Sequence, residues 1–207
     1  MFTRKSYLKI HIGCMFATKS THLKNDILAL CHQGYRCVAI RFDIDDRYSK
    51  LDIKEIITHN KDVLYDKQHE NLSVMVFNLS DFQREENLEK NLKLLNDFDV
   101  IGIDEVHFIT TEGFLKKLED KLVTKCEKIL ILSTLNVFAN GEQVRNILEI
   151  IATAEKVKHH KSICFICFKK GATRSVRKNS SENDSLIDVG GLEKYISVCR
   201  RCFNTIN

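Results

Sequence analysis

The sequence predicts an α/β fold, in which helices flank a mainly parallel sheet, and two observations lead to that expectation. Short apolar runs rich in Val, Ile, Leu and Phe alternate with longer amphipathic stretches from residue 8 to residue 154. Strand and helix in turn produce βαβ units, whose strands run parallel. The chain has 207 residues, 43% hydrophobic and 29% charged, which suits one good core plus a small satellite domain and excludes a largely disordered chain.

The expected elements follow in order along the chain. Five brief apolar segments have the character of buried strands: residues 8–12, 38–42, 73–77, 100–103 and 129–132. Four stretches carry apolar residues at helical spacing: residues 20–31, 82–96, 111–123 and 144–154. Ser80 and Gln83 fit the Ser-x-x-Gln capping pattern, so we expect Ser80 or Asp81 to cap the second helix. Residues 43–68 are polar and charge-rich, which predicts a partly ordered excursion near the functional edge of the sheet.

A domain boundary is expected near residue 160, where the alternation of strands and helices stops. Residues 1–160 would form the α/β domain, and residues 161–207, with two CxxC pairs, a small second domain. The net charge of +4 is mild and does not by itself indicate nucleic-acid binding. No stretch approaches the ~20 apolar residues of a membrane span, and the N-terminus lacks a leader pattern, so we expect a cytoplasmic protein without membrane contact.

A candidate phosphate-binding loop is the first motif that carries chemistry. It follows a predicted strand, opens a predicted helix and consists of Gly13, Cys14, Met15, Phe16, Ala17, Thr18, Lys19 and Ser20. In a P-loop, backbone N–H groups face the phosphates, the Lys reaches the β and γ oxygens, and the Ser hydroxyl helps to hold Mg²⁺. Thr18 stands where the motif requires Gly, which adopts unusual φ angles more easily than a β-branched residue. The alternative is a coincidental strand-to-helix turn with a surface lysine.

Two adjacent carboxylates form the second motif. Asp104 and Glu105 follow an apolar strand, at the edge where open α/β sheets bind ligands. One carboxylate can hold a metal ion while the other takes a proton from a nucleophile. Because the P-loop candidate also follows a strand, both motifs are expected at one edge of the sheet. Two solvated acids in a loop are the alternative.

The cysteines divide into two groups of four. Two CxxC pairs, each able to form a tight knuckle, predict a tetrahedral zinc site from Cys164, Cys167, Cys199 and Cys202, with free or redox thiols as the alternative. The other four, Cys14, Cys31, Cys37 and Cys126, lie in or beside predicted strands and helices, and we expect them to be small core residues.

Five blocks of the sequence resemble a known family. GCMFATKST, DIDDRY, IGIDEVHF, CFIC and GGLEKYISVCRRC stand in the order and approximate spacing of patterns in the type II thymidine kinases. The resemblance runs from about Leu8 to Cys202. It implies a RecA-like P-loop fold with a zinc-binding lasso, and ATP, Mg²⁺ and structural Zn²⁺ as cofactors. It also implies thymidine as substrate and a homotetramer, with no nucleic-acid partner.

The resemblance also implies roles for individual residues. Asp45 and Arg47 match a pair near the phosphates, Glu105 matches the catalytic base, and Asp104 would assist the metal. His107, which replaces the family's Gln, would lie on the ATP side. Phe108 would line the nucleoside pocket, and either Phe138 or Ala139 would face the substrate. The loop over the base would comprise Leu186, Ile187, Asp188, Val189, Gly190 and Tyr195.

Three hypotheses follow. The first is an ATP:thymidine 5′-phosphotransferase with Glu105 as base. The second is a catalytically weakened relative, which Thr18 and the altered segments around Phe138 and after Cys167 motivate. The third is a P-loop ATPase or nucleic-acid module in which the zinc knuckles act with a basic run formed by Lys169, Lys170, Arg174, Arg177 and Lys178.

Overall fold

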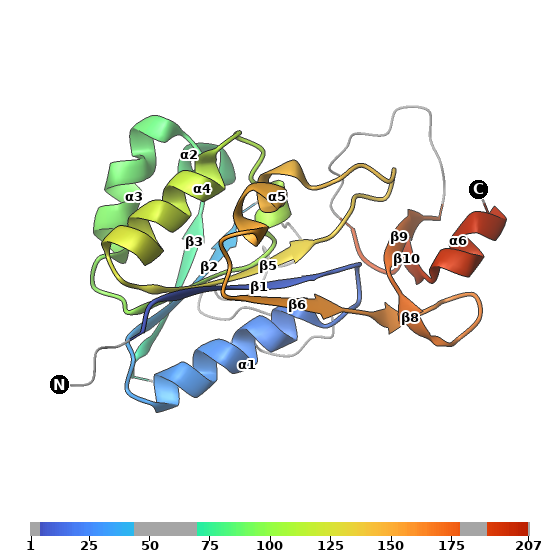
Figure 1. Ribbon diagram of the computed structural model, residues 1–207, viewed down its shortest axis with the longest axis horizontal. Helices are drawn as coiled ribbons and strands as arrows, with labels where there is room; N and C mark the ends of the chain where they lie inside the picture. Colours follow the sequence, from blue (N-terminus) through green and yellow to red (C-terminus); the bar gives the residue numbers. More distant parts are fainter. Residues whose placement is uncertain (1–4, 44–69, 179–189, 207) are drawn as a thin grey trace.

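The computed structural model describes residues 5–43, 70–178 and 190–206, and its centre is a six-stranded sheet (Figure 1). All neighbouring strands in it pair in parallel, in the order β3-β2-β4-β5-β1-β6. The strands are β1 (Tyr7–Gly13), β2 (Cys37–Phe42), β3 (Leu72–Phe77), β4 (Val100–Ile103), β5 (Ile129–Leu135) and β6 (Lys156–His160). The five predicted strands and the mainly parallel α/β fold are therefore confirmed.

The two edge strands differ from the sequence-based expectation. β6 was not predicted, because its side chains are charged or polar at four of five positions and it lies at the edge, largely exposed to solvent. β3 was predicted as a buried strand but forms the opposite edge and is only half-buried. An edge strand has a neighbour on one side alone, so it tolerates solvent-exposed residues that a central strand does not.

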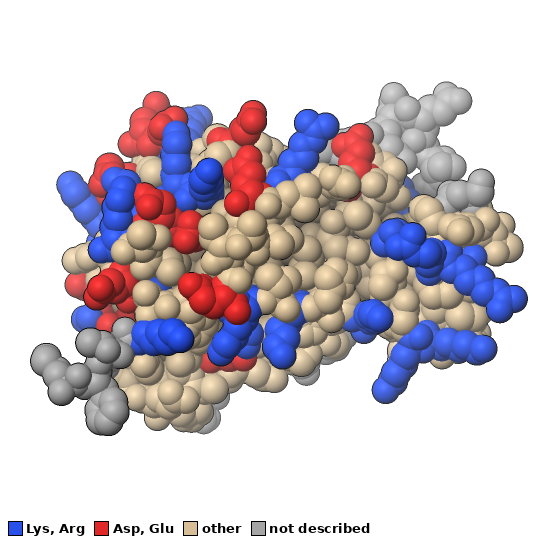
Figure 2. Space-filling view, viewed as in Figure 1, with Lys and Arg blue, Asp and Glu red and all other residues tan. Residues whose placement is uncertain are grey.

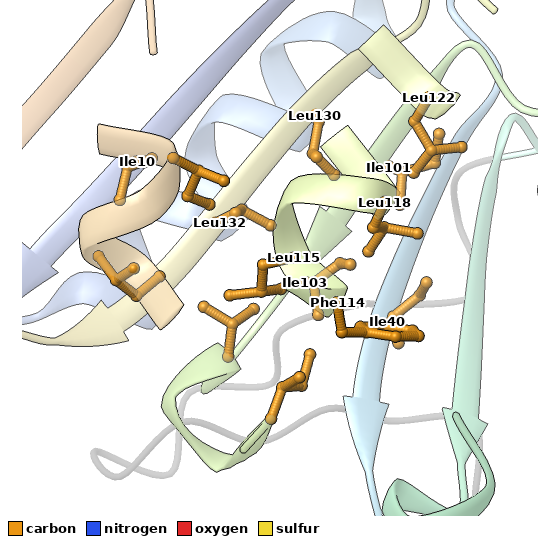
Figure 3. Packing of buried hydrophobic residues seen from close by; sticks show 14 of the residues in the cluster. Ile10, Ile40, Ile101, Ile103, Phe114, Leu115, Leu118, Leu122, Leu130 and Leu132 are labelled. Carbon is orange, nitrogen blue, oxygen red and sulfur yellow. The ribbon is translucent and has the colours of Figure 1, made fainter. Parts of the chain in front are cut away.

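Helices cover both faces of the sheet. In Figure 1, α1 (Lys19–His32) lies on one face, and the other carries α2 (Leu79–Phe82), α3 (Leu88–Leu95), α4 (Phe114–Glu119) and α5 (Arg145–Ile151). Figure 3 shows the core beneath the second group, where Ile40 and Ile103 of the sheet meet Phe114 and Leu118 of α4. Burial of each such side chain contributes about 1.5–3 kcal/mol.

The helix predicted at residues 82–96 begins later than expected. α2 ends at Phe82, a 3₁₀ turn at Glu85–Asn87 follows, and α3 begins at Leu88. The expected cap, Ser80 or Asp81, is also wrong: both residues lie inside α2, whose cap is Asn78, because Asn78 Oδ1 accepts the Asp81 N–H at 3.0 Å. The predicted helix at residues 111–123 is likewise divided between α4 and a π-helical segment, Asp120–Lys125.

A smaller lobe follows β6. It comprises two antiparallel pairs, β7 (Ser162–Ile163) with β8 (Lys170–Ala172) and β9 (Arg174–Arg177) with β10 (Tyr195–Val198), and then α6 (Arg200–Ile206). We call residues 161–178 and 190–206 the cysteine lobe. On the face seen in Figure 2, its end of the molecule displays Lys and Arg, while Asp and Glu gather toward the other end. No helix within the described ranges is long and apolar enough to cross a membrane.

Candidate active site

The P-loop candidate connects β1 to α1. Gly13 is the last residue of β1, and a Cβ there would lie 2.4 Å from the carbonyl oxygen of His160, so the close approach of β6 requires glycine. Farther along α1, Gly102 of β4 leaves room for Ile27, because a Cβ at that glycine would lie 2.1 Å from Ile27 Cδ1. These two close approaches set the position of the loop and of the helix that follows it.

Thr18 adopts the left-handed backbone conformation that the motif normally assigns to glycine. Its φ is 57° and its ψ is 24°, and it is the N-cap of α1, with no capping hydrogen bond from its side chain. The hydroxyl donates instead to the carbonyl of Ala17 at 2.8 Å, while Thr18 O accepts the N–H of His22 at 3.1 Å. The loop therefore keeps the backbone path of the motif, at the conformational cost of a β-branched residue in the αL region.

Lys19 is buried, and its ammonium points back into the loop. Nζ donates a hydrogen bond to the carbonyl of Cys14 at 2.9 Å, and only 6% of the residue is exposed. The expectation of a surface lysine, the alternative to a P-loop, is thus contradicted. A buried cation beside a helix N-terminus creates a strongly positive environment for an anionic ligand.

The carboxylate pair lies where β4 ends. Asp104 N–H donates to the Ile40 carbonyl at 3.1 Å, and Glu105 N–H donates to Asp104 Oδ1 at 3.0 Å. Burial and the neighbouring Glu105 charge raise the pKa of Asp104 to about 6, against the opposing effects of Ser133, Ser20 and Lys19. Because Ser20 and Lys19 of the loop are close enough to affect Asp104, the two motifs lie at the same edge of the sheet. Strand β5 lies between β1, which leads into the loop, and β4, which leads into the carboxylate pair.

An aromatic cluster adjoins Glu105. His107 Nδ1 lies 3.2 Å from Glu105 Oε2, and the His107 ring lies 4.3 Å from that of Phe108 and 6.1 Å from that of Phe138. Burial and the charge of Lys19 lower the pKa of His107 to about 3, so its imidazole is neutral. Of the two candidates for the substrate-facing position, Phe138 therefore contributes a ring to this cluster.

The four predicted zinc ligands come together in the cysteine lobe. The Sγ atoms of Cys164, Cys167, Cys199 and Cys202 all lie within 4.8 Å of one another, with 3.9 Å between Cys167 and Cys199. Tetrahedral Zn²⁺ with bonds of about 2.3 Å places its sulfurs about 3.8 Å apart, so the donors fit zinc. Within the described ranges this is the only such group of potential metal ligands.

Three of the other four cysteines are core residues, as expected. Cys14, Cys31 and Cys37 are buried, but Cys126 is exposed, so its assignment to the core was wrong. Cys126 comes directly after the π-helical segment, where the chain turns at the surface toward β5.

Several candidate residues cannot be placed in the site. Asp45 and Arg47, and the stretch Leu186, Ile187, Asp188 and Val189, lie outside the described residues, as does most of the polar excursion at 43–68. Gly190 and Tyr195 belong to the cysteine lobe, where Tyr195 is buried and the Arg177 guanidinium lies 6.0 Å from its ring centroid.

Sequence reasoning missed several polar groups around the loop. Ser133, on β5, is fully buried beside Asp104, and its Oγ makes no hydrogen bond of good geometry among the described residues. Asn136 Nδ2 donates to the Thr173 carbonyl at 2.9 Å, and Ser175 Oγ accepts the Met15 N–H at 3.0 Å. Only Ser133 had a local signal, since it is the polar residue that ends the apolar run at 129–132. The contacts of Asn136 and Ser175 join residues far apart in the sequence, so no local pattern indicates them.

Together, the fold and this site define an α/β protein of the P-loop class whose smaller lobe contains four cysteines placed to hold a metal ion. A sequence profile of the thymidine kinase family matches residues 6–203, and the chain belongs to that family. It is 30% identical over 202 residues to the thymidine kinase of Amsacta moorei entomopoxvirus, covering 95% of this chain and 97% of the relative. The thymidine kinase of Fowlpox virus is 32% identical over 198 residues, covering 94% and 96%. Thymidine kinase 1 of Dictyostelium discoideum is 25% identical over 199 residues, covering 96% and 78%.

Proposed function

We propose that this chain is a thymidine kinase that transfers the γ-phosphoryl group of ATP to the 5′-hydroxyl of thymidine. The observation that carries the proposal is the convergence of Lys19, Ser20, Asp104 and Glu105 at one sheet edge in a member of this family. Phosphoryl transfer needs little covalent chemistry from the protein, so positioning and charge neutralisation supply most of the acceleration.

The loop would bind the phosphates of ATP. Lys19 would exchange the Cys14 carbonyl, which it contacts at 2.9 Å, for a phosphate oxygen of the transferring group. That exchange replaces a neutral acceptor by a charged one, and charge-assisted hydrogen bonds are roughly twice as strong as neutral ones.

Mg²⁺ would be held by Ser20 and Asp104. Their oxygen donors suit this cation, and the pKa of Asp104 is raised first by burial and then by the charge of Glu105, both of which a bound cation would offset. When bound, Mg²⁺ supplies charge neutralisation for the phosphates.

Glu105 would take the proton from the 5′-hydroxyl of the nucleoside as that oxygen attacks phosphorus. Its backbone is left-handed, with φ of 55°, which is unusual for a non-glycine residue, and it caps the 3₁₀ turn Val106–Phe108 that follows β4. The rings of Phe108 and Phe138 would provide the apolar wall for the nucleoside beside it, and His107, which contacts both rings, would lie on the ATP side.

The family resemblance supports further proposals. Asp45 and Arg47 would lie near the phosphates, and residues 186–190 with Tyr195 would cover the base. Residues 1–160 and 161–207 would be separate domains, Zn²⁺ would be structural, and the chain would form a cytoplasmic homotetramer. Sedimentation of the purified protein tests the assembly, and zinc analysis of the same sample tests the metal.

A catalytically weakened relative is the second candidate, and the αL conformation of Thr18 is the observation in its favour. Phosphate transfer from ATP to a panel of nucleosides separates the two. The proposed function predicts dTMP formation with Mg²⁺ present; nucleotide binding without phosphate transfer to any nucleoside would favour the weakened relative.

A further inference from the structure

The cysteine lobe contacts the P-loop directly through residues 172–175, the joint between its two small sheets. The Met15 N–H donates to Ser175 Oγ at 3.0 Å, and the Cys14 thiol donates to the Ala172 carbonyl at 3.3 Å. Between these two contacts, the Thr173 carbonyl accepts the side-chain amide of Asn136, which follows β5, at 2.9 Å. The joint is thereby attached to the α/β domain at three successive points.

Apolar packing joins the same two regions. Cys14 and Ala17 of the loop belong to one buried cluster with the zinc-ligand candidate Cys164, and with Ala172 and Val198 of the lobe. The remaining three ligand candidates, Cys167, Cys199 and Cys202, pack against that cluster. Protein interiors are close-packed, so a displacement of the ligands is transmitted to the loop rather than absorbed.

The position of the joint depends in turn on the ligand cysteines. Thr173 N–H donates to the Val198 carbonyl at 3.1 Å, one residue before Cys199. In the β9–β10 pair, Ser175 lies opposite Ser197, whose hydroxyl donates to the Ile163 carbonyl at 2.9 Å, one residue before Cys164. Both CxxC pairs therefore border strands that hold the joint in place.

Ser175 is the polar link in this arrangement. It is 2% exposed, so its hydroxyl meets the N–H of the half-buried Met15 away from bulk water. An amide that loses its acceptor in such surroundings carries a free-energy cost, which favours a rearrangement of the loop that satisfies it.

We infer that Ser175 couples the zinc centre to the nucleotide site: an ordered cysteine lobe holds the P-loop in its binding conformation, and bound nucleotide strengthens zinc binding. The inference rests on the proposed function in one respect, that a nucleotide binds at the P-loop. Coupling between two sites is reciprocal, so it can be measured at either one. Ser175 acts here as a positioning residue.

The test measures the zinc dissociation constant of the full chain by competition with a chromogenic chelator. It compares excess Mg²⁺ alone with excess Mg²⁺ plus a saturating non-hydrolysable ATP analogue. Wild-type protein is expected to bind zinc at least about fivefold more tightly with the analogue, the lower end of ordinary coupling. In Ser175→Ala the ratio should fall to about one, and Ser175→Thr, which keeps a hydroxyl, should restore much of it.

Ser197→Ala is the matched control, because it removes a buried serine hydroxyl from the cross-strand partner position, with hydrogen bonds inside the lobe only. It should weaken zinc binding but keep most of the nucleotide ratio of the wild type, because the hydrogen bond from the Thr173 N–H to the Val198 carbonyl still ties the joint to the strand before Cys199. Direct chelation of zinc by the analogue would affect every variant equally, so it cannot mimic the expected difference.

The inference would be overturned if the analogue left the zinc dissociation constant of the wild type unchanged. It would also be overturned if the analogue tightened zinc binding in Ser175→Ala as much as in the wild type. Calorimetric titration of the analogue on the same samples separates this from the proposed function: bound nucleotide without any effect on zinc removes the coupling and leaves the kinase assignment intact. Conversely, a protein in which the analogue strengthens zinc binding, but which transfers no phosphate to thymidine, would support the inference and contradict the proposed function.

Discussion

Glu105 and His107 face each other across 3.2 Å, from Oε2 to Nδ1, beside the end of β4. His107 Nδ1 is buried and makes no hydrogen bond of good geometry within the described residues, so the contact has the distance of a hydrogen bond without its alignment. Because the imidazole is neutral, it can offer Glu105 an N–H but no positive charge. A rotation of either side chain would complete the bond and orient the carboxylate for proton transfer.

We therefore predict that His107→Gln keeps kcat within about threefold, since an amide N–H can replace the imidazole N–H. His107→Leu should lower kcat about tenfold or more, the value of a hydrogen bond to a charged group, with little change in KM for ATP. Steady-state kinetics of both variants check this. Wild-type kcat in the Leu variant would show that Glu105 needs no partner here.

Thr18→Gly should stabilise the protein without a large change in turnover. The αL region costs an L-residue about 1–2 kcal/mol, and the extra freedom of glycine in the unfolded chain offsets about 0.5–1 kcal/mol. We expect a net gain of about 0.5–1 kcal/mol in the free energy of unfolding, measured by denaturant titration, with kcat within about twofold. A large rise in kcat would instead show that Thr18 weakens the natural protein.

The ionised form of Asp104 should destabilise the fold, although it is the form that binds Mg²⁺. Its folded-state pKa, about 6, lies above the ordinary value of 3.8, so the stability due to the protonated carboxyl is full below pH 3.8 and lost as pH rises through 6. Asp104→Asn should therefore raise Tm at pH 8 but change it little at pH 4, while abolishing Mg²⁺-dependent activity. In the wild type, Mg²⁺ affinity should fall below pH 6. Equal Tm changes at both pH values would refute this account.

A histidine network that joins α1 to strands β1 and β6 should set the acid limit of stability. His11 Nε2 lies 2.7 Å from Asp26 Oδ2 and its Nδ1 lies 2.8 Å from His160 Nε2, while the rings of His22 and His160 stack at 4.3 Å; Lys9 also pairs with Asp26. Burial, then His22 and His11, lower the pKa of His160 to about 4.

The unfolded chain protonates this histidine near pH 6.5, so stability is present above that pH and lost as pH falls toward 4. His160→Gln should flatten the decline of Tm between pH 6.5 and 4.5, whereas His159→Gln, at the exposed neighbouring position, should not. Parallel Tm profiles for the wild type and His160→Gln would contradict the prediction.

The central strands and both motifs could be predicted because their signals are local. Runs such as residues 100–103 are apolar at every position, and Asp104 and Glu105 come directly after that run. Convergence of the motifs at one edge follows from parallel strands, whose carboxyl ends share a side of the sheet. β6 could not be predicted, because an exposed edge strand carries no apolar pattern.

Other misses arise from competition between similar groups or from distance along the chain. Asn78, Ser80 and Asp81 can all cap a helix, and the choice of Asn78 depends on tertiary contacts, since its Nδ2 donates to Asp43 Oδ2 at 2.8 Å. The Met15–Ser175 contact joins residues 160 positions apart, so no local pattern indicates it.

The proposed function is tested most directly by phosphate transfer from ATP to thymidine with Mg²⁺ present, in wild type, Glu105→Ala and the exposed control Glu112→Ala. We predict dTMP formation by the wild type and the control, and a loss of about 10²–10⁴-fold in kcat for Glu105→Ala, the usual contribution of a general base. ATP binding should be nearly unchanged in all three. No transfer by the wild type, or wild-type turnover by Glu105→Ala, would contradict the account.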